Sequence, residues 1–378
     1  MSSNSPSNRI SLCIALPSSP RILYKEIGDM ILDVLEGSAY RARIVADGDD
    51  EALNAELLLI IGDCQAFQLY ADLFNSKRKH RPVTILWMLD TLPPVSFTPQ
   101  AAKIGSRLSI YNESLNFMRS YMKPVVNAIP LSVRKHLGLA VCSALLTGLD
   151  EELRRSSQEE LQGLDVNSRY EVIGRSEWMR SNYESGWLDH VVANTTSKCQ
   201  FLQKIGIPSE FIPFGYHTGM GEDLHLHRDI DVLFLGEIAY GRRKPILDNI
   251  RARLSEKGID LTVNSGNCYG RERSELLSRA KISLNLPRFT WDLPTIRLFM
   301  SMGCGSMVAS EYVADTTPFV SGEHFVQATA DKIADKIAYY LNHDAEREAI
   351  SARATKLITT DYTLEKALQR VLALYEKS

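Results

Sequence analysis

The sequence predicts an α/β protein with two doubly wound parallel sheets. Short apolar runs with strand character alternate along the chain with segments whose apolar residues recur at helical spacing. Several of these runs are apolar throughout, which is typical of strands that helices cover on both faces. With 378 residues, the chain also exceeds the size that one core supports comfortably, so two domains are expected.

The composition is that of a soluble globular protein, with 44% hydrophobic and 24% charged residues. A net charge of only -3 argues against a dedicated nucleic-acid binder, which would be basic. The six cysteines include no C-x-x-C pair. Reduced thiols in a cytoplasmic protein are therefore expected, and a structural zinc site is not.

The first 90 residues predict a polar tail followed by alternating strands and helices. Residues 1–9 lack an apolar core and are expected to be a disordered tail. The expected strands are 10–16, 43–46, 56–62 and 83–88, with one helix carrying the apolar residues from Leu23 to Leu35 and another at 64–75.

Asp90 is the first candidate functional residue because it follows the strand at 83–88. Ligands of open α/β sheets bind at the carboxyl ends of the strands. Asp90 is therefore a candidate to accept a proton from a bound hydroxyl group or to orient it. A turn-forming aspartate before Pro93 and Pro94 explains the residue equally well.

The middle of the chain is less informative. Residues 111–165 look helical, and the charge-rich run 151–162 is expected to be a solvated face. The apolar run 137–149 is shorter than the roughly 20 residues that cross a bilayer; a buried helix is expected, with contact to a membrane surface as the alternative. Four residues of the stretch 166–186 either line an acceptor pocket or simply pack: Arg175, Glu177, Trp178 and Tyr183.

A glycine-rich, charged passage at 216–228 is predicted to link the two domains. Before it, strand 188–193 leads to a helix that ends at Ile205 and that Thr195 or Thr196 is expected to cap. The linker holds three histidines, at 217, 225 and 227, but their spacing in a loop does not favour a metal. The predicted division is a first domain at 10–215, a linker at 216–228, a second domain at 229–360 and a final segment at 361–378.

The second half opens with a pattern suited to a diphosphate. Strand 231–235 ends in Gly236 and Glu237, and Arg242, Arg243 and Lys244 follow at the start of a helix. Glycine lets the backbone approach a ligand, and guanidinium groups form charge-assisted bonds to phosphate oxygens. A solvated helix start is the alternative, but cations fit the positive end of a helix dipole poorly. No G-x-G-x-x-G and no G-x-x-x-x-G-K-[ST] motif is present.

The stretch 281–311 reads as a βαβ unit with a second anion-binding surface. A strand at 281–286 is followed by a loop with Arg288, Trp291 and Pro294, a helix at 295–302 and a Gly-Cys-Gly turn. The other expected elements are strands 260–264 and 306–309 and helices 270–280, 330–342, 344–358 and 363–376. The last helix has an apolar face and must pack on another element.

From about residue 188 to residue 375, the sequence resembles the C-terminal half of the CgeB-like, group-1-type glycosyltransferases. The resemblance rests on five segments in order: VVANTTSKCQFLQKIGIPSEFIPFGYHTG, DVLFLGEIAYGRRKPIL, AKISLNLPR, RLFMSMGCGSMVASE and FVSGEHFVQA. ILWMLDTLPP in the first half is similar to a segment that faces the cleft in several such enzymes. The resemblance implies the GT-B architecture, in which two Rossmann-like domains face each other and a final helix crosses back to the first.

The resemblance also implies roles for named residues. A sugar would pass from a nucleotide diphosphate donor, held by the second domain, to an acceptor held by the first. Gly236 and Glu237 would line the donor cleft, and Arg242 and Arg243 would approach the diphosphate. Asn285 and Arg297 would border the sugar and phosphates, while Gly303, Gly305 and Ser306 would allow close backbone approach. Arg242 and Asp90 are the expected catalytic residues.

One position departs from the family pattern R-x-F-E-A-x-x-x-G. Met300 stands where related enzymes have the glutamate that holds the nucleotide ribose. A thioether cannot accept the two hydroxyl hydrogen bonds that a carboxylate accepts. Either another residue holds the ribose, for which Glu311 is the candidate, or donor binding is altered or lost.

The resulting expectation is a metal-independent, retaining, hexosyltransferase-type enzyme that uses UDP or another nucleotide as the donor carrier and needs no cofactor. The alternatives are a nucleotide-sugar epimerase on the same fold and a degenerate, non-catalytic relative that binds a nucleotide or a partner protein. The sequence does not identify the acceptor or the oligomeric state.

Overall fold

The structure, a computed structural model, describes residues 9–17, 22–76, 81–97, 166–238, 242–266 and 268–377. The predicted disordered tail, apart from Arg9, lies outside these residues. The same holds for the predicted helical region 111–165, with its apolar run 137–149 and its charged run 151–162. Met1–Leu92 and Trp178–Ser378 form one compact unit, divided from Pro93–Glu177.

The first sheet has six parallel strands in the order β2-β1-β3-β4-β5-β6. Its strands are β1 (Ile10–Leu16), β2 (Tyr40–Ala46), β3 (Leu57–Gly62), β4 (Val83–Met88), β5 (His190–Ala193) and β6 (Glu210–Phe211), and the connecting helices are α1 (Ile22–Leu35), α2 (Gln68–Ser76), α7 (Val166–Glu184) and α8 (Thr196–Lys204). The central strands β3 and β4 are almost entirely buried. This burial explains why they could be recognised as continuous apolar runs.

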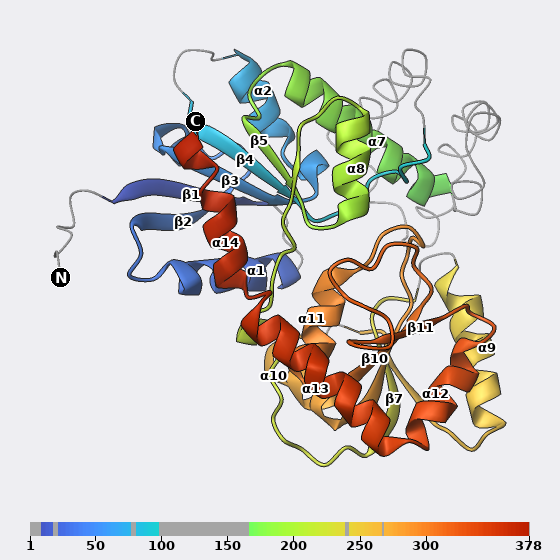
Figure 1. The fold of residues 1–378 in the computed structure, drawn as a ribbon. Helices are drawn as coiled ribbons and strands as arrows, with labels where there is room; N and C mark the ends of the chain where they lie inside the picture. The colour runs from blue at the N-terminus through green and yellow to red at the C-terminus, as the bar shows by residue number, and fades with distance from the viewer. Residues whose placement is uncertain are drawn as a thin grey trace, which may run out of the picture. The chain divides into compact units, whose positions relative to one another are not determined.

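The second sheet has five parallel strands in the order β11-β10-β9-β7-β8. Its strands are β7 (Ile230–Leu235), β8 (Leu261–Asn264), β9 (Ala280–Asn285), β10 (Met307–Glu311) and β11 (Val326–Ala328), and its helices are α9 (Arg243–Ser255), α10 (Gly270–Arg279), α11 (Thr295–Gly303), α12 (Ile333–Leu341) and α13 (Asp344–Thr360). The predicted class of two parallel α/β sheets is confirmed (Figure 1). The predicted linker 216–228 falls between the last strand of the first sheet and the first strand of the second.

Several local predictions need correction. The predicted helix 64–75 divides into a 3-10 turn at Cys64–Ala66 and helix α2, because the backbone of Phe67 leaves the helical region. Strand β2 begins at Tyr40, three residues before the predicted start, since pairing with β1 extends it through polar residues. The undecided stretch 166–186 is the long helix α7. Its residue Trp178 is buried and its indole N–H donates to Gln68, so this side chain packs in the interior.

The last helix, α14 (Leu364–Leu372), returns to the first half of the chain and lies beside α1 (Figure 1). Its buried side chains join the same apolar core as residues of β1 and α1, including Leu12 and Ile27. Where the chain crosses, the Tyr216 N–H donates to the Tyr362 carbonyl at 2.7 Å, and the Leu364 N–H donates to the Tyr216 carbonyl at 2.8 Å.

Replacing Leu368, which is 1% exposed, by alanine is expected to destabilise the protein by about 2–5 kcal/mol, because the change leaves a cavity between α14 and the first sheet. Urea denaturation followed by circular dichroism measures the effect. The exposed residue Glu365 of the same helix provides the control, and Glu365→Ala should leave the midpoint nearly unchanged. Equal midpoints for both variants would contradict the packing of α14.

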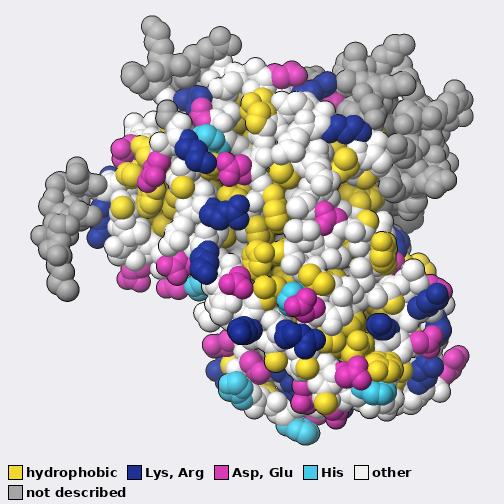
Figure 2. Space-filling view, viewed as in Figure 1, with side chains coloured by type: hydrophobic (Ala, Val, Ile, Leu, Met, Phe, Trp, Pro, Cys, Tyr) yellow, Lys and Arg dark blue, Asp and Glu magenta, His cyan; other side chains and the backbone are white. Residues whose placement is uncertain are grey.

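On the face shown in Figure 2, basic and acidic side chains lie among one another and neither sign forms a continuous field. Within the described residues, no helix is long and apolar enough to cross a membrane.

Candidate functional site

The carboxyl ends of strands β7, β9 and β10 bring together several of the predicted donor residues. Gly236 follows β7, Asn285 ends β9, and Ser310 and Glu311 end β10. Asn285 lies directly opposite Ser310 in the parallel register, and its side-chain amide donates to the Ser310 hydroxyl at 2.9 Å. Because these strands are parallel, their ends meet at one edge of the sheet, where ligands of such sheets bind.

Arg297, in the first turn of α11, reaches this edge. One terminal nitrogen of its guanidinium, Nη1, donates to the Asn285 side-chain oxygen at 3.1 Å and to the Leu286 carbonyl at 3.3 Å. Within the described part of the chain, no carboxylate forms an ion pair with Arg297. Two predicted residues, Asn285 and Arg297, are therefore in direct contact.

Gly236 permits this arrangement because it has no side chain. Its φ is +148°, and a Cβ placed on it would lie 3.3 Å from the other terminal nitrogen of Arg297. That distance is short for a carbon atom against a guanidinium group. The glycine after β7 thus lets the backbone and the Arg297 side chain lie close together.

A second guanidinium adds positive charge at the same place. Arg243 is buried, and its Nη1 donates to the Glu237 carbonyl at 3.0 Å. Burial, together with the neighbouring positive charge of Arg243, lowers the pKa of Arg297 to about 9. The guanidinium remains a cation at neutral pH. Two cations held close together in a partly buried place favour an anionic ligand.

Arg242 and Glu311 lie at the same edge, but they bind each other. Both terminal nitrogens of Arg242 donate to the Glu311 carboxylate, one of them at 2.7 Å, and Arg242 also contacts the Pro287 carbonyl. The Glu311 side chain is only 6% exposed. From the sequence, Arg242 was expected to bind the diphosphate and Glu311 was the candidate to bind the ribose. The structure instead shows one bidentate ion pair, in which each charge is already compensated.

Gly303, Gly305 and Ser306 lie away from this cluster. They join the carboxyl end of α11 to the start of β10. Asn285 and Glu311, in contrast, are at the carboxyl ends of β9 and β10. A Cβ on Gly303 would lie 2.3 Å from the ring of Tyr216, and one on Gly305 would lie 2.7 Å from the Asp223 carboxylate. The close backbone approach predicted for these glycines is therefore to the linker.

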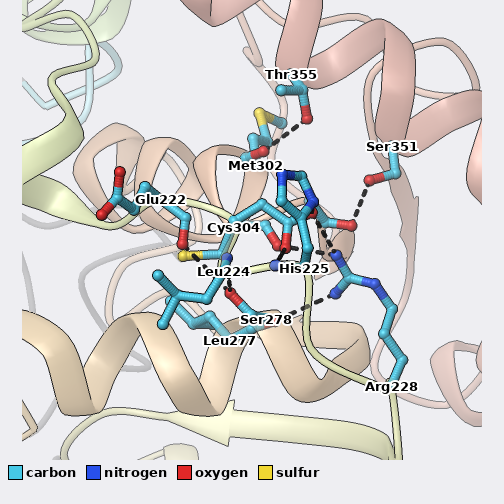
Figure 3. A network of polar contacts seen from close by, with 12 residues as sticks. Glu222, Leu224, His225, Arg228, Leu277, Ser278, Met302, Cys304, Ser351 and Thr355 are labelled. Carbon is cyan, nitrogen blue, oxygen red and sulfur yellow. Dashed lines mark hydrogen bonds and ion pairs between the residues drawn. The ribbon is translucent and has the colours of Figure 1, made fainter.

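Arg228 attaches the linker to the second sheet at the end where β9 and β10 begin (Figure 3). Its guanidinium donates to the carbonyl of Ala280, which follows α10, at 2.7 Å and to Asp223 at 3.2 Å. It also donates to the carbonyl of Cys304, which follows α11, at 2.9 Å. Ser278 accepts a hydrogen bond from the Leu224 N–H at 3.0 Å in the same network. A cation that binds the free carbonyls at the ends of helices is favourable for the helix dipoles. The histidines at 217, 225 and 227 belong to this linker, and the described residues contain no metal-binding cluster.

Met300 is half-buried on α11, one turn after Arg297. It packs against the small apolar cluster that contains Leu233, Leu277 and Cys304. The thioether therefore serves the packing of α11 on its neighbours.

Asp90 follows β4, as predicted, and the Tyr24 hydroxyl donates to its carboxylate at 2.5 Å. Tyr24 itself lies over Gly62, the last residue of β3, whose φ is +108° and where a Cβ would lie 2.4 Å from the tyrosine ring. Asp90 is therefore oriented by a residue of α1.

The sequence interpretation missed a buried polar cluster near Asp90. Asp292, in the loop between β9 and α11, accepts hydrogen bonds from Thr91 at 2.6 Å and Thr195 at 2.9 Å, and forms an ion pair with Lys198 at 2.9 Å. Thr195 occupies the position before α8 that was predicted to be a cap, but its side chain makes no capping bond. The signal in the sequence was a lone aspartate among the aromatic residues and prolines of that loop.

The chain is similar to known proteins in part of its sequence and in its fold. Residues 228–373 match the model of a family described as glycosyl transferase-like. Among solved structures, a sucrose-phosphate synthase from Thermosynechococcus elongatus matches with a TM-score of 0.58 and 11% identity over 98% of this chain and 99% of that one. Anabaena HepE in complex with UDP and glucose matches with a TM-score of 0.57 and 10% identity, over 98% of this chain and all of that one. The sequence has no significant match among curated proteins.

The chain has the GT-B fold. At these identities the structural likeness shows the fold alone. The family match covers the second sheet and its helices. The second sheet with its helices is therefore similar to a glycosyl transferase-like family. The CgeB-like subtype remains a prediction from the sequence segments.

Proposed function

We propose that this GT-B protein transfers a hexose from a nucleotide diphosphate donor to an acceptor bound by the first half of the chain. The observation that carries the proposal is the position of Arg297 beside Gly236 and Arg243 at the carboxyl ends of the strands. The cationic pair suits the two negative phosphates of the donor. UDP is the proposed carrier, in keeping with the UDP held by the HepE crystals.

The chemical contribution of this site would be electrostatic. As the bond between sugar and diphosphate breaks, negative charge develops on the leaving group, and fixed guanidinium groups stabilise it without a metal ion. The amino end of α11 adds the positive end of a helix dipole on the same side. We propose that no cofactor is needed, because the leaving group needs only the charges that the chain supplies. Retention of configuration is also proposed, as expected from the sequence.

Asp90 is the proposed acceptor-side residue. Its carboxylate accepts a hydrogen bond from the Tyr24 hydroxyl at 2.5 Å, which orients it just after the carboxyl end of β4. In this role Asp90 would orient the acceptor hydroxyl or take its proton.

The second candidate is a non-catalytic relative that binds a nucleotide or a partner protein, and Met300 is the observation that favours it. A nucleotide-sugar epimerase would use the same donor site without an acceptor. Product analysis separates the two enzymes, because epimerisation changes the donor with no acceptor present.

The test of the proposal is calorimetric titration of the full chain with UDP, GDP, ADP, CDP and dTDP. We expect saturable binding of at least one of them, and the tightest would name the donor base. Addition of magnesium or EDTA should leave the affinity unchanged if the arginines alone hold the diphosphate. Absence of binding by all five would favour the non-catalytic relative.

A further inference from the structure

The buried cluster around Asp292 joins two distant parts of the chain. The Asp292 carboxylate belongs to the loop after β9 of the second sheet. Its three partners, Thr91, Thr195 and Lys198, follow strands β4 and β5 of the first sheet. The side chains of Lys198 and Asp292 are only 3% and 5% exposed.

A buried ion pair contributes little net stability, because its charges must be removed from water. Removing two charges from water costs several kcal/mol per ion, and the attraction between them often does no more than offset that cost. In addition, Thr195 gives its hydroxyl to Asp292 at the position where a capping bond to α8 was expected. The buried ion pair, together with a threonine that binds Asp292 instead of capping its helix, suggests that this geometry is needed for function.

Asp292 is not placed to act as a base or a nucleophile. One of its oxygens accepts from Thr195, and the other accepts from Thr91 and Lys198 at 2.6 and 2.9 Å. Both oxygens of the carboxylate are thus engaged by side chains of the protein itself. Its contribution must act through the elements that it holds.

The element it holds is the first turn of α11. Asp292 lies three residues before Thr295, the first residue of that helix. The side-chain amide of Asn194 donates to the Thr295 hydroxyl at 3.3 Å, while Lys198 donates to the oxygen of the same amide at 2.8 Å. Two bonded links from the first half of the chain thus fix the start of α11, which carries Arg297.

We propose that Asp292 and Lys198 are positioning residues of the donor site, which hold the first turn of α11 so that Arg297 meets the diphosphate. This inference rests on the proposed function. It assigns neither residue a contact with the substrate. Their effect on the donor passes through Arg297.

A double-mutant cycle tests this coupling with the affinity of the full chain for the nucleoside diphosphate that binds best. Asp292→Asn should weaken binding about tenfold in the native background, since the ion pair and the fixed geometry are lost. In the Arg297→Ala background the same change should have no further effect. Thr195→Val removes a single hydrogen bond to Asp292 and should show a smaller loss of the same kind.

The matched control is Glu26→Gln. Glu26 of α1 also joins the two halves of the chain, through an ion pair with Arg273 of α10 at 2.7 Å, but it does not touch α11 in the described contacts. Its loss should leave the affinity unchanged in both backgrounds, and circular dichroism should show all variants folded.

The outcomes separate the inference from the proposed function. If the native protein binds no nucleoside diphosphate, both are overturned. If it binds, and Asp292→Asn binds equally well or weakens binding by the same factor with and without Arg297, only the positioning role is overturned. A similar loss in Glu26→Gln would also overturn it, because any contact between the halves would then suffice.

Discussion

Replacing Arg297 by alanine is expected to lower kcat/KM for the nucleotide sugar about 10²-fold. A charge-assisted hydrogen bond to a buried phosphate contributes about 1.5–3 kcal/mol, and loss of a fixed charge that stabilises the leaving group has an effect of this size. Arg297 has no carboxylate partner in the described residues, so its charge is available to the ligand. The rate at which nucleoside diphosphate is released, by donor hydrolysis or by transfer, measures the change.

Two further variants make this experiment specific. Arg297→Lys keeps the charge but loses the forked donor geometry, and should retain part of the activity. Arg253→Ala removes an exposed arginine of α9 that pairs with Asp335, and should behave like the native protein. A normal rate in Arg297→Ala, with a loss confined to Arg242→Ala, would return the leading role to Arg242 and contradict our assignment.

The sequence predicted the edge of the second sheet where Gly236, Asn285 and Arg297 meet. Gly236 was identified from its place after a strand, whereas Asn285 and Arg297 were implied by the resemblance to a family. Parallel pairing brings the carboxyl ends of the strands to one edge. The pairing of Arg242 with Glu311 was not predictable in the same way. It depends on which strands are neighbours across the sheet, and periodicity carries no information about that order.

Two other errors have the same origin. Thr195 has the residue type and position of a helix cap, but a buried carboxylate from a distant loop takes its hydroxyl, so tertiary contacts override the local preference. Gly303 and Gly305 were interpreted as space for a ligand, and the neighbour that needs the space is the linker. In both cases the sequence identified a special residue correctly, while its partner lay too far along the chain to be inferred.

A large effect on stability is also expected of Gly215→Ala, at the point where the linker meets the returning chain. Gly215 has a φ of +88°, and a Cβ there would lie 2.6 Å from the carbonyl oxygen of Thr363. An alanine in this left-handed conformation costs about 1–2 kcal/mol. Pushing apart two backbone segments that share hydrogen bonds adds about 1–3 kcal/mol. The free energy of unfolding, from urea denaturation, should fall by the sum of the two.

Gly206→Ala separates the two contributions. Gly206 has nearly the same φ, +85°, but nothing lies within 4 Å of its would-be Cβ. This variant should therefore show only the conformational cost, and the difference between the two variants measures the contact of Gly215 with Thr363. Because Tyr216 and Thr363 are the paired residues where the chain leaves the first sheet and returns to it, that difference also tests how closely the two crossing segments must pack. Equal losses in the two variants would mean that the crossing relaxes without cost, and the tight pairing at Tyr216 would then contribute little to stability.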